Sequence, residues 1–176
     1  MGHAHNVEFL ALNIAVLTVS DSRTDENDTS GNLLVSKLEE SGHKLAEKII
    51  VSDNRYKIRE IISRWIADDN VQAVITTGGT GLTGRDITPE AIHPLFDKTI
   101  EGFGELFRQL SYEFIKTSTI QSRAIAGLAN ATAIFCLPGS PGACKDGWEG
   151  IIKYQLDLTH KPCNLVEMMP RFLEAE

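Results

Sequence analysis

The sequence predicts an α/β fold, a three-layer αβα sandwich whose central sheet is mostly parallel. Apolar runs with the length of buried strands alternate along the chain with segments that carry the hydrophobic spacing of helices. Strands that alternate with helices form parallel sheets through right-handed crossovers. A chain of 176 residues buries roughly 70% of its unfolded surface by area scaling, which suits one full core. We therefore expect a single domain over residues 12–176, after a flexible segment at residues 1–11.

The N-terminal third contains the first expected strand, helix and second strand. Residues 12–19 form a mostly apolar run that is typical of a central strand. A polar loop at 20–28 leads into a helix at about 29–41. Gly42 ends this helix, because glycine readily adopts the left-handed backbone found at helix C-termini. Residues 45–51 form the second strand.

The second helix has the clearest hydrophobic pattern. Asn54 is placed to cap it. Apolar residues then follow at i, i+3, i+4, i+7 and i+8, namely Ile58, Ile61, Ile62, Trp65 and Ile66. This spacing indicates one buried helical face, so we expect Trp65 in the core rather than at a ligand platform. Residues 71–77 form the third strand.

The C-terminal half continues the alternation. Thr88-Pro89-Glu90 begins a helix with proline in its first turn. Gly102 and Gly104 are expected to precede the next helix, which carries Leu106, Phe107, Leu110 and Phe114. The remaining expected elements are a short helical segment at 120–128, a fourth strand at 131–137 and a closing helix from 140 to about 156.

Composition and charge exclude several classes of function. A net charge of −7 and a pI near 5.2 argue against a nucleic-acid surface, because that surface needs a basic face. A small anionic ligand remains compatible, since local dipoles and one arginine act within a Debye length of ~8 Å. Three cysteines without CxxC spacing indicate neither a disulfide framework nor a zinc site. No signal-peptide pattern and no run of ~20 apolar residues is found, so we expect a cytoplasmic protein without a membrane partner.

The segment most informative about function spans residues 71–91. A strand leads into the glycine-rich turn Gly78-Gly79-Thr80-Gly81, followed by Arg85, Asp86 and a helix start. Glycines let backbone N–H groups turn toward an anion, and a helix N-terminus adds a favourable dipole. The segment is not a P-loop, because Arg85 and Asp86 stand where that motif has Lys and then Ser or Thr, and it lacks GxGxxG. It indicates a phosphate or nucleotide site, with a merely tight loop as the alternative.

Loops at one edge of the sheet share a composition that favours a binding site. Ligands of open α/β sheets collect beyond the carboxyl ends of the strands. The loops expected at those ends are rich in Gly, Ser or Asp, and they comprise residues 20–22, 52–54, 78–86 and 138–142. We expect these loops to converge.

Two aspartates are candidates for a metal ion. Asp53 and Asp86 each follow a strand, and Mg²⁺ prefers one or two carboxylates together with phosphate oxygens and water. The pair therefore suits a nucleotide-bound ion. In the alternative, Asp53 is a turn or helix-cap residue and Asp86 is a partner for Arg85. Asp21 and the segment Asp28–Gly31 are placed to line the same pocket, although Asp28 is equally suited to a plain N-cap.

Two further segments are candidates for anion binding. In the turn Pro138-Gly139-Ser140-Pro141, Ser140 caps the closing helix and leaves N–H groups free for a phosphate, although many strand-to-helix turns look the same. Arg123, next to Ser122, offers a guanidinium for bidentate phosphate contact, with a surface salt bridge as the alternative. The histidines have no ligand-spaced partners, and aromatic residues are too few to form a stacking platform for bases.

Several blocks of sequence resemble the MoaB/Mog family of molybdenum cofactor biosynthesis, which includes the gephyrin G domain. The most specific is Thr76-Thr-Gly-Gly-Thr-Gly81 followed by Arg85-Asp86-Ile-Thr-Pro-Glu-Ala91. The others are Leu17-Thr-Val-Ser-Asp21, Asp28-Thr-Ser-Gly31, Gly102-Phe-Gly-Glu105, Ser122-Arg123-Ala-Ile-Ala-Gly127 and Leu137-Pro-Gly-Ser-Pro141. Four more blocks are most similar in sequence to the MoaB branch: Asn54-Arg-Tyr, Trp65-Ile-Ala, Thr117-Ser-Thr and Lys161-Pro-Cys-Asn164.

The resemblance implies a molybdopterin adenylyltransferase-like protein that transfers AMP from Mg-ATP to molybdopterin. It implies catalytic and magnesium-binding roles for Asp53 and Asp86. The nucleotide- and substrate-binding positions that it implies are Ser20, Asp21, Gly78, Gly79, Thr80, Gly81, Arg85, Ser122, Arg123, Pro138, Gly139, Ser140 and Pro141.

The resemblance leaves one functional alternative. The sequence resembles the MoaB branch, which departs from the Mog-type members although the blocks of the fold persist. The chain is therefore also compatible with a non-catalytic protein of the same pathway that holds molybdopterin or a precursor. Asp53 and the pair Arg85-Asp86 favour catalysis. Members of the family associate as trimers and MoaB-like members as larger rings, so we expect a homotrimer or a dimer of trimers. Three phenylalanines suit such an interface as well as the core, namely Phe103, Phe107 and Phe114.

Overall fold

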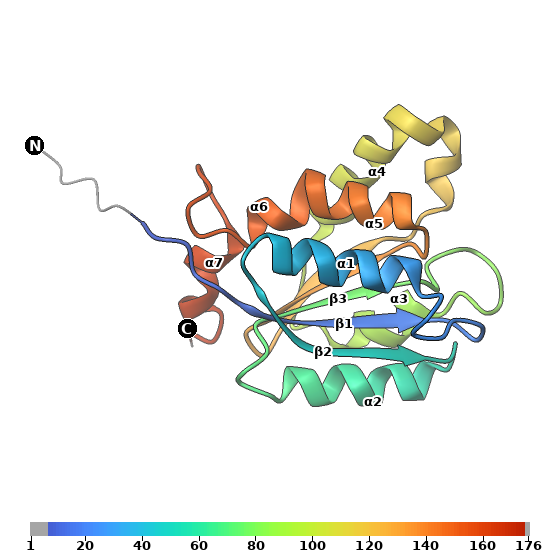
Figure 1. The fold of residues 1–176 in the computed structure, drawn as a ribbon, viewed down its shortest axis with the longest axis horizontal. Helices are drawn as coiled ribbons and strands as arrows, with labels where there is room; N and C mark the ends of the chain where they lie inside the picture. Colours follow the sequence, from blue (N-terminus) through green and yellow to red (C-terminus); the bar gives the residue numbers. More distant parts are fainter. Residues whose placement is uncertain (1–6, 175–176) are drawn as a thin grey trace, which may run out of the picture.

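A computed structural model, which describes residues 7–174, has one six-stranded sheet in the order β2-β1-β3-β6-β5-β4 (Figure 1). The four strands β2, β1, β3 and β6 are parallel, and β5 and β4 join antiparallel at one edge. The strands are β1 Asn13–Val19, β2 Lys44–Val51, β3 Ala73–Thr77, β4 Lys98–Thr99, β5 Ile125–Ala129 and β6 Thr132–Leu137. The predicted three-layer fold with a mostly parallel sheet is confirmed.

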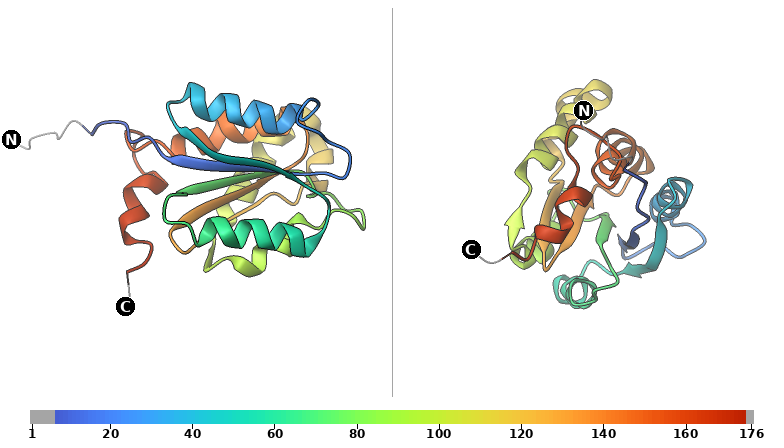
Figure 2. Two further views of the ribbon diagram at one scale, coloured as in Figure 1. Left: turned by 60° about the horizontal axis from the view of Figure 1, so that its bottom comes forward. Right: turned by 90° about the vertical axis from the view of Figure 1, so that its left-hand side faces the viewer.

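Helices cover both faces of the sheet (Figure 2). One face packs against α1, α4 and the closing helical segment, and the other packs against α2 and α3. The helices are α1 Thr29–Glu40, α2 Arg55–Ile66, α3 Thr88–Ile92, α4 Glu101–Ile115, α5 Pro141–Gly147, α6 Lys153–Gln155 and α7 Leu165–Met168. A π-helical stretch, Trp148–Ile152, joins α5 to α6, so the closing helix expected from 140 to about 156 is one continuous helical segment.

Strand β1 shows how the sequence divides its side chains between two cores. Ile14 and Val16 belong to the core on the α1 face, whereas Ala15 and Leu17 belong to the core on the α2 face. This alternation follows from the two-residue side-chain period of a strand. All four residues are completely buried because the central strand has helices on both sides.

The ends of the first two helices are as the sequence predicts. The Asp28 carboxylate accepts the Gly31 N–H at the start of α1. Gly42 follows α1 with φ +88°, in the left-handed region. The Asn54 side-chain oxygen accepts two N–H groups of the first turn of α2, and Trp65 is 2% exposed, as expected for a core residue.

The prediction of a short helical segment at 120–128 is wrong. A 3-10 turn, Lys116–Gln121, is followed by strand β5, which pairs antiparallel with β6. Asn130 and Ala131 join the two strands with φ +44° and +69°, the left-handed conformation of a tight two-residue hairpin. Pairing with β6 therefore overrides the helix-forming tendency of an alanine-containing segment, and the turn has no Asn-Gly signal to reveal it.

Helix α4 begins earlier than the sequence predicts. Gly102 and Gly104 lie inside it rather than before it. A Cβ atom at Gly104 would approach the Ala124 carbonyl oxygen to 2.5 Å, so this glycine permits α4 to pack closely on the segment leading into β5. Of the aromatic residues proposed for core or interface, Phe103 and Phe107 are core residues, 3% and 1% exposed.

The N-terminal segment expected to be flexible at residues 1–11 lies partly outside the described residues. Residues 7–11 have no helix or strand, and the Phe9 ring packs 5.0 Å from the ring of His43. Along residues 7–174, no helix is long and apolar enough to cross a membrane.

Candidate functional site

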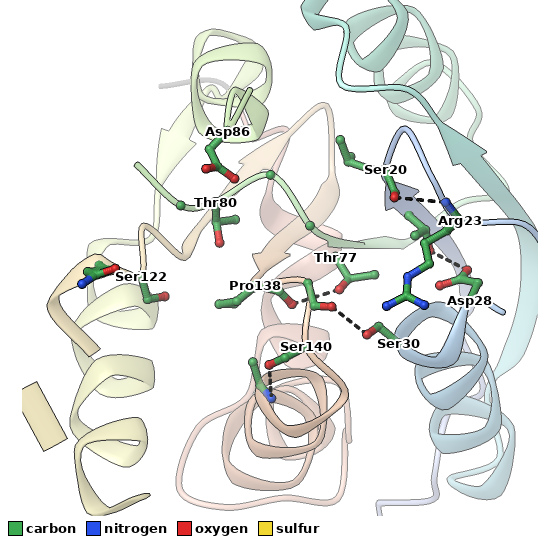
Figure 3. Close-up of a pocket in the computed structure, with 18 of the residues that line it drawn as sticks. Ser20, Arg23, Asp28, Ser30, Thr77, Thr80, Asp86, Ser122, Pro138 and Ser140 are labelled. Atoms are coloured by element: carbon green, nitrogen blue, oxygen red, sulfur yellow. Dashed lines mark hydrogen bonds between the residues drawn. The ribbon is translucent and has the colours of Figure 1, made fainter. Parts of the chain in front are cut away.

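A cavity of about 510 Å³ lies beyond the carboxyl ends of β1, β3 and β6 (Figure 3). The ends of these strands and the loops after them line it, at residues 18–20, 22–23, 77–81 and 138–140, and α4 supplies a further wall. Its volume is within the range of ordinary small-molecule sites. Three of the four loops predicted to converge therefore meet at this edge of the sheet.

The glycine-rich loop is held in a shape that only glycine accepts. Gly78 and Gly79 have φ values of +101° and +68°. A Cβ atom would lie 2.3 Å from the Val19 carbonyl oxygen at Gly78 and 2.3 Å from Thr88 Oγ1 at Gly79. Thr88 at the start of α3 fixes the loop, because its hydroxyl donates to the Gly78 carbonyl at 2.8 Å and its N–H donates to the Gly79 carbonyl at 2.9 Å.

The backbone of this loop is available to a ligand. Among the described residues, the N–H groups of Gly79 and Thr80 donate to no acceptor. Both residues line the cavity. Two unpaired N–H groups on a glycine-rich turn at the edge of a parallel sheet are the type of group that binds phosphate oxygens.

Arg123 stabilises the same loop from outside the cavity lining. Its Nε donates to the Gly81 carbonyl at 2.8 Å, and its second terminal nitrogen donates to the Asp86 carbonyl at 2.7 Å. The remaining terminal nitrogen pairs with the Glu90 carboxylate. The guanidinium predicted to bind phosphate is thus directed at protein oxygens in this structure, and it does not line the cavity.

Asp86 lies at the cavity wall with its carboxylate turned toward its own loop. Oδ2 accepts the Thr83 N–H at 2.9 Å and the Thr83 hydroxyl at 2.6 Å. Burial raises the pKa of Asp86, but the hydrogen bonds from Thr83 and Gly81 and the charge of Arg123 outweigh it, so the pKa is lowered overall. Asp86 therefore carries a stable negative charge at the cavity.

Asp53 belongs to a second acidic group beside the cavity. Its N–H donates to Asp21 Oδ1 at 3.0 Å, and Asp21 in turn pairs with Arg85 at 3.2 Å. Burial and the neighbouring Asp21 charge raise the pKa of Asp53, and the charge of Asp86 adds to the effect. Within residues 7–174, no three side chains of His, Cys, Asp or Glu come together as a metal site.

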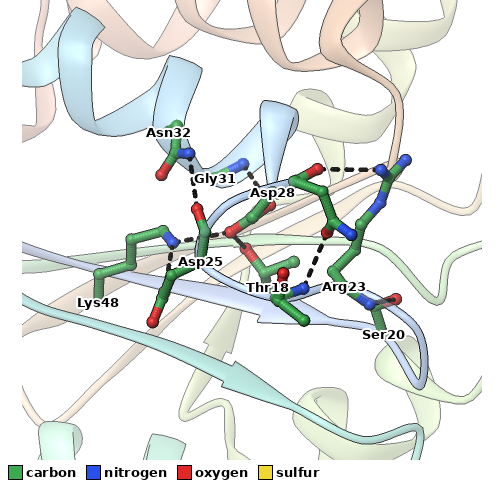
Figure 4. A network of polar contacts seen from close by, with 10 residues as sticks. Thr18, Ser20, Arg23, Asp25, Asp28, Gly31, Asn32 and Lys48 are labelled. Atoms are coloured by element: carbon green, nitrogen blue, oxygen red, sulfur yellow. Dashed lines mark hydrogen bonds and ion pairs between the residues drawn. The ribbon is translucent and has the colours of Figure 1, made fainter.

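A buried ion pair supports the β1 side of the cavity (Figure 4). The Asp28 side chain is 1% exposed, and its Oδ2 lies 2.9 Å from Lys48 Nζ. The Thr18 hydroxyl donates to the same oxygen at 2.8 Å, and the Gly31 N–H donates to Oδ1 at 2.9 Å. A Cβ atom at Gly31 would lie 2.2 Å from Asp28 Oδ2, so only glycine leaves room for this carboxylate. Asp28 is both the predicted helix cap and a cavity residue.

The loop after β6 is tied to the start of α1 and to the end of β3 by hydroxyl groups. The Ser30 hydroxyl donates to the Gly139 carbonyl at 2.9 Å, and the Thr77 hydroxyl donates to the Pro138 carbonyl at 2.9 Å. Ser140 caps α5 as predicted, accepting the Ala143 N–H at 3.2 Å. These bonds fix the loop after β6 against α1 and β3.

The predicted site residues divide into two groups. Ten line the cavity, namely Ser20, Gly78, Gly79, Thr80, Gly81, Asp86, Ser122, Pro138, Gly139 and Ser140. Five lie outside its lining, namely Asp21, Asp53, Arg85, Arg123 and Pro141. The first three of these form the neighbouring acidic group, and Pro141 begins α5.

Several lining residues are not predicted by the sequence. They are Arg23 from the β1 side, and Phe107, Ser111, Ile115 and Gln121 from α4 and the turn after it, whereas Ser22 and Ser30 lie in segments that the sequence did place at the pocket. Arg23 is the one cation of an otherwise acidic loop, which is a signal that the sequence does contain. Ser111 carries no such signal, because a serine on an amphipathic helix has no motif around it.

The fold and the cavity define a class: a three-layer α/β domain with a cavity lined by a glycine-rich loop at the carboxyl edge of its sheet. Comparison with known proteins gives the family. Residues 15–158 match the sequence model described as "Probable molybdopterin binding domain". The chain belongs to the MoaB/Mog family of molybdenum cofactor biosynthesis proteins.

Relatives and solved structures agree with this assignment. Molybdenum cofactor biosynthesis protein B of Escherichia coli K12 is 56% identical over 159 residues, which cover 90% of this chain and 94% of that protein. The Bacillus subtilis protein of the same name is 50% identical over 131 residues, or 74% of this chain and 77% of that protein. A crystal structure of molybdenum cofactor biosynthesis protein B has a TM-score of 0.81 at 41% identity, covering 84% of this chain and 92% of that one. The tungsten cofactor synthesizing protein MoaB from Pyrococcus furiosus has a TM-score of 0.73 at 38% identity, covering 80% and 90%.

Proposed function

We propose that this protein binds molybdopterin and transfers AMP to it from Mg-ATP. An oxygen of the terminal phosphate of molybdopterin attacks the α-phosphorus of ATP, the bond from that phosphorus to the bridging oxygen breaks, and pyrophosphate leaves. Such transfers require mainly positioning and charge neutralisation from the protein. The observation that carries the proposal is the pair of unpaired N–H groups at Gly79 and Thr80, two residues that line the cavity of a molybdenum cofactor biosynthesis domain.

The acidic residues fit a nucleotide-bound magnesium ion. Asp53 has a raised pKa because of burial and the negative charge of Asp21, and a cation beside it would offset both effects. Mg²⁺ takes one or two protein carboxylates and completes its shell with phosphate oxygens and water, so the lack of a third ligand among the described residues is compatible with it. In this proposal Asp53 and Asp86 hold the ion, which neutralises the triphosphate.

The other binding positions have supporting roles in the proposal. The loop Gly78–Gly81 holds a phosphate through the N–H groups of Gly79 and Thr80, since the Gly78 N–H already donates to the Leu137 carbonyl at 3.0 Å. Ser122 and the loop Pro138–Pro141 contact the pterin substrate, together with Ser20. Arg85 and Asp21 act on the nucleotide side next to Asp53, and Arg123 acts through the glycine-rich loop that it supports.

A second function is molybdopterin binding without transfer. The orientation of Asp86 favours it, since both donors of Thr83 already satisfy the carboxylate oxygen Oδ2. An ion at this position would have to replace those bonds. The two functions share one cavity and differ only in turnover.

An adenylylation assay separates the two functions. The protein is incubated with molybdopterin, Mg²⁺ and α-labelled ATP, beside the variants Asp53→Asn and Asp86→Asn. Asp69→Asn is the control, because Asp69 is an exposed aspartate in the turn before β3. If only the wild type and the control form labelled adenylyl-molybdopterin, the result supports AMP transfer that requires both carboxylates. Molybdopterin binding by all four proteins without labelled product supports the binding function instead.

We also propose that the protein works in the cytoplasm as a homotrimer or a dimer of trimers. Size-exclusion chromatography with light scattering tests the oligomer. A mass equal to one chain at micromolar concentration contradicts it.

A further inference from the structure

His43 is a buried titratable residue at the end of the sheet opposite the cavity. It lies between α1 and β2, and it is 5% exposed. The Leu12 N–H donates to its Nδ1 atom at 3.2 Å. Leu12 ends the segment of residues 7–12, here called the N-terminal strap, which leads into the amino end of β1 (Figure 1). His43 therefore contacts the strap rather than the cavity.

This histidine is the main attachment of the strap. The Phe9 ring lies 5.0 Å from the imidazole ring. It also covers Gly42, where an added Cβ atom would lie 3.1 Å from Phe9 Cε1. Within residues 7–11, no backbone group is hydrogen-bonded to another described residue. The strap is thus held by one aromatic contact and by the Leu12 N–H, and both depend on His43.

The hydrogen bond fixes the protonation state of the ring. Because the Leu12 N–H is a donor, Nδ1 must present a lone pair, so the neutral ring carries its proton on Nε2. A protonated imidazole has a donor on each nitrogen. Protonation would place two N–H groups face to face and leave the buried Leu12 N–H without an acceptor, which is unfavourable.

The surroundings of the ring disfavour its charged form. On the side away from Phe9, the Trp148 ring lies 6.3 Å from the imidazole in an edge-on arrangement. Burial lowers the pKa of His43 below its ordinary value of 6.5, and the negative charge of Asp157 offsets part of that effect. The neutral ring is therefore the form present at pH 7.

The other charged groups on the adjoining elements do not reverse this effect. Lys37 on α1 pairs with Glu40 at 3.3 Å and with Glu149 at 3.1 Å. Three more charged residues on the strap, α1 and β2 are exposed to solvent, namely Glu8, Glu39 and Lys44. Asp157 is the one described charge that acts on the His43 ring.

We propose that His43 is a pH-sensitive clamp, which holds the N-terminal strap when its ring is neutral and releases the strap when the ring is protonated. The sign follows from linkage. A histidine with a lowered folded-state pKa favours the closed strap fully above the unfolded value of 6.5, and it favours the open strap increasingly as the pH falls below that value. The clamp and the proposed function are independent, because they lie at opposite ends of the sheet.

Nuclear magnetic resonance of the full-length, ¹⁵N-labelled protein tests the clamp between about pH 7.5 and about pH 5. Ring nitrogen shifts report the protonation of His43. Hydrogen exchange, corrected for the intrinsic effect of pH, reports the protection of the Leu12 amide, with the Val16 amide in the middle of β1 as an internal reference. Backbone relaxation reports the mobility of residues 7–11.

Two variants separate the clamp from other effects of acid. His43→Gln does not titrate, and its side-chain oxygen is able to accept the Leu12 N–H. His93→Gln is the control, because it removes an exposed histidine elsewhere.

In the wild type, we expect the protection of the Leu12 amide to fall at least about tenfold over this range, since an opening linked to one proton shifts up to about tenfold per pH unit. The midpoint should lie below pH 6.5 and coincide with the titration of the His43 ring. The mobility of residues 7–11 should rise with it, and Val16 should stay protected. His43→Gln should lose the pH dependence, and His93→Gln should keep it.

Several results would overturn the proposal. One is a neutral His43 ring that carries its proton on Nδ1, because the bond from Leu12 would then be absent. Another is an equal loss of protection at Leu12 and Val16, which would mean that the whole domain opens. A third is titration of His43 without any change in the mobility of residues 7–11. If His43→Gln does not fold, the coincidence of the two wild-type midpoints decides, and separate midpoints contradict the clamp.

Discussion

The buried ion pair between Asp28 and Lys48 permits a quantitative test of what holds the cavity together. The perturbation is Lys48→Met, which keeps the length and the apolar stem of the side chain but removes its charge. Asp28 is 1% exposed and Lys48 is 14% exposed, and their atoms lie 2.9 Å apart. The variant therefore leaves a buried carboxylate with only the Thr18 hydroxyl and the Gly31 N–H.

The expected cost follows from this geometry. Removing one partner of a buried pair costs about 3–5 kcal/mol, because the remaining charge is uncompensated. The second contact of Lys48, to Asp25 at 3.2 Å, adds at most about 1 kcal/mol because Asp25 is 91% exposed. For a chain of this size, each kcal/mol lowers the unfolding temperature by about 2–4 °C, so we expect a fall of about 10 °C.

Thermal and urea unfolding at pH 7 measure the effect, with Lys44→Met as the control at an exposed position of the same strand. Asp28→Asn should cost less than Lys48→Met, because the amide leaves no buried charge and still accepts one hydrogen bond. The double variant should recover about 1–3 kcal/mol relative to the sum of the single changes. A cost below about 1 kcal/mol for Lys48→Met, or strict additivity in the double variant, refutes the reasoning.

The pH dependence supplies a second measure of the same pair. Burial raises the pKa of Asp28, but the hydrogen bonds from Lys48, Gly31 and Thr18 outweigh it, so the pKa falls below its ordinary value of 3.8. A group with a lowered folded-state pKa contributes its full stability above the unfolded value and loses it as the pH falls through the folded value. The stability difference between wild type and Asp28→Asn should therefore be constant above about pH 5 and shrink below pH 3.8.

Two further predictions concern the glycine-rich loop and the thiols. Gly78→Ala should lower the free energy of unfolding by at least about 3 kcal/mol, since it combines a positive φ with a contact of 2.3 Å to the Val19 carbonyl oxygen. Gly84→Ala, with no atom within 4 Å of the added Cβ, should be neutral, and equal effects of the two changes in urea unfolding would contradict this account. Native protein at pH 8 should react with one equivalent of a thiol reagent, at the exposed Cys163, because burial raises the pKa of Cys136 to about 12. Cys163→Ser should abolish this labelling, and reaction of a second thiol before unfolding would show that the interior opens.

Local signals were sufficient to predict most of the fold. Asn54 and the apolar spacing after it specify α2, and the structure has both the cap and the buried face. Strand β5 was missed because its identity depends on pairing with β6 rather than on its own composition. The two residues of the joining turn adopt positive φ without glycine, so the hairpin left no trace in the sequence.

The site was predicted where loops carry motifs and missed where a helix carries none. The glycine-rich loop and the loop after β6 were identified from residue types that only special backbone shapes need. Ser111 and Ile115 reach the cavity because α4 crosses its mouth, and that packing depends on Gly104 fitting against the Ala124 carbonyl oxygen. The partners of Arg123 were equally hidden, since two of them are backbone carbonyls whose positions follow from the folded loop.

The proposed anion site requires a local positive potential at the cavity, although the protein as a whole is acidic. Around this cavity, Lys48 is paired with Asp28, Arg85 with Asp21, and Arg123 with Glu90. These cations neutralise carboxylates that the fold itself places at the carboxyl edge of the sheet. Arg23 is the one described cation that lines the cavity, no described carboxylate pairs with it, and its charge would add to the unpaired N–H groups of Gly79 and Thr80. Because both sources act over a few ångströms, well inside the Debye length of ~8 Å, the proposed binding of a phosphate-bearing ligand is compatible with the net charge of −7.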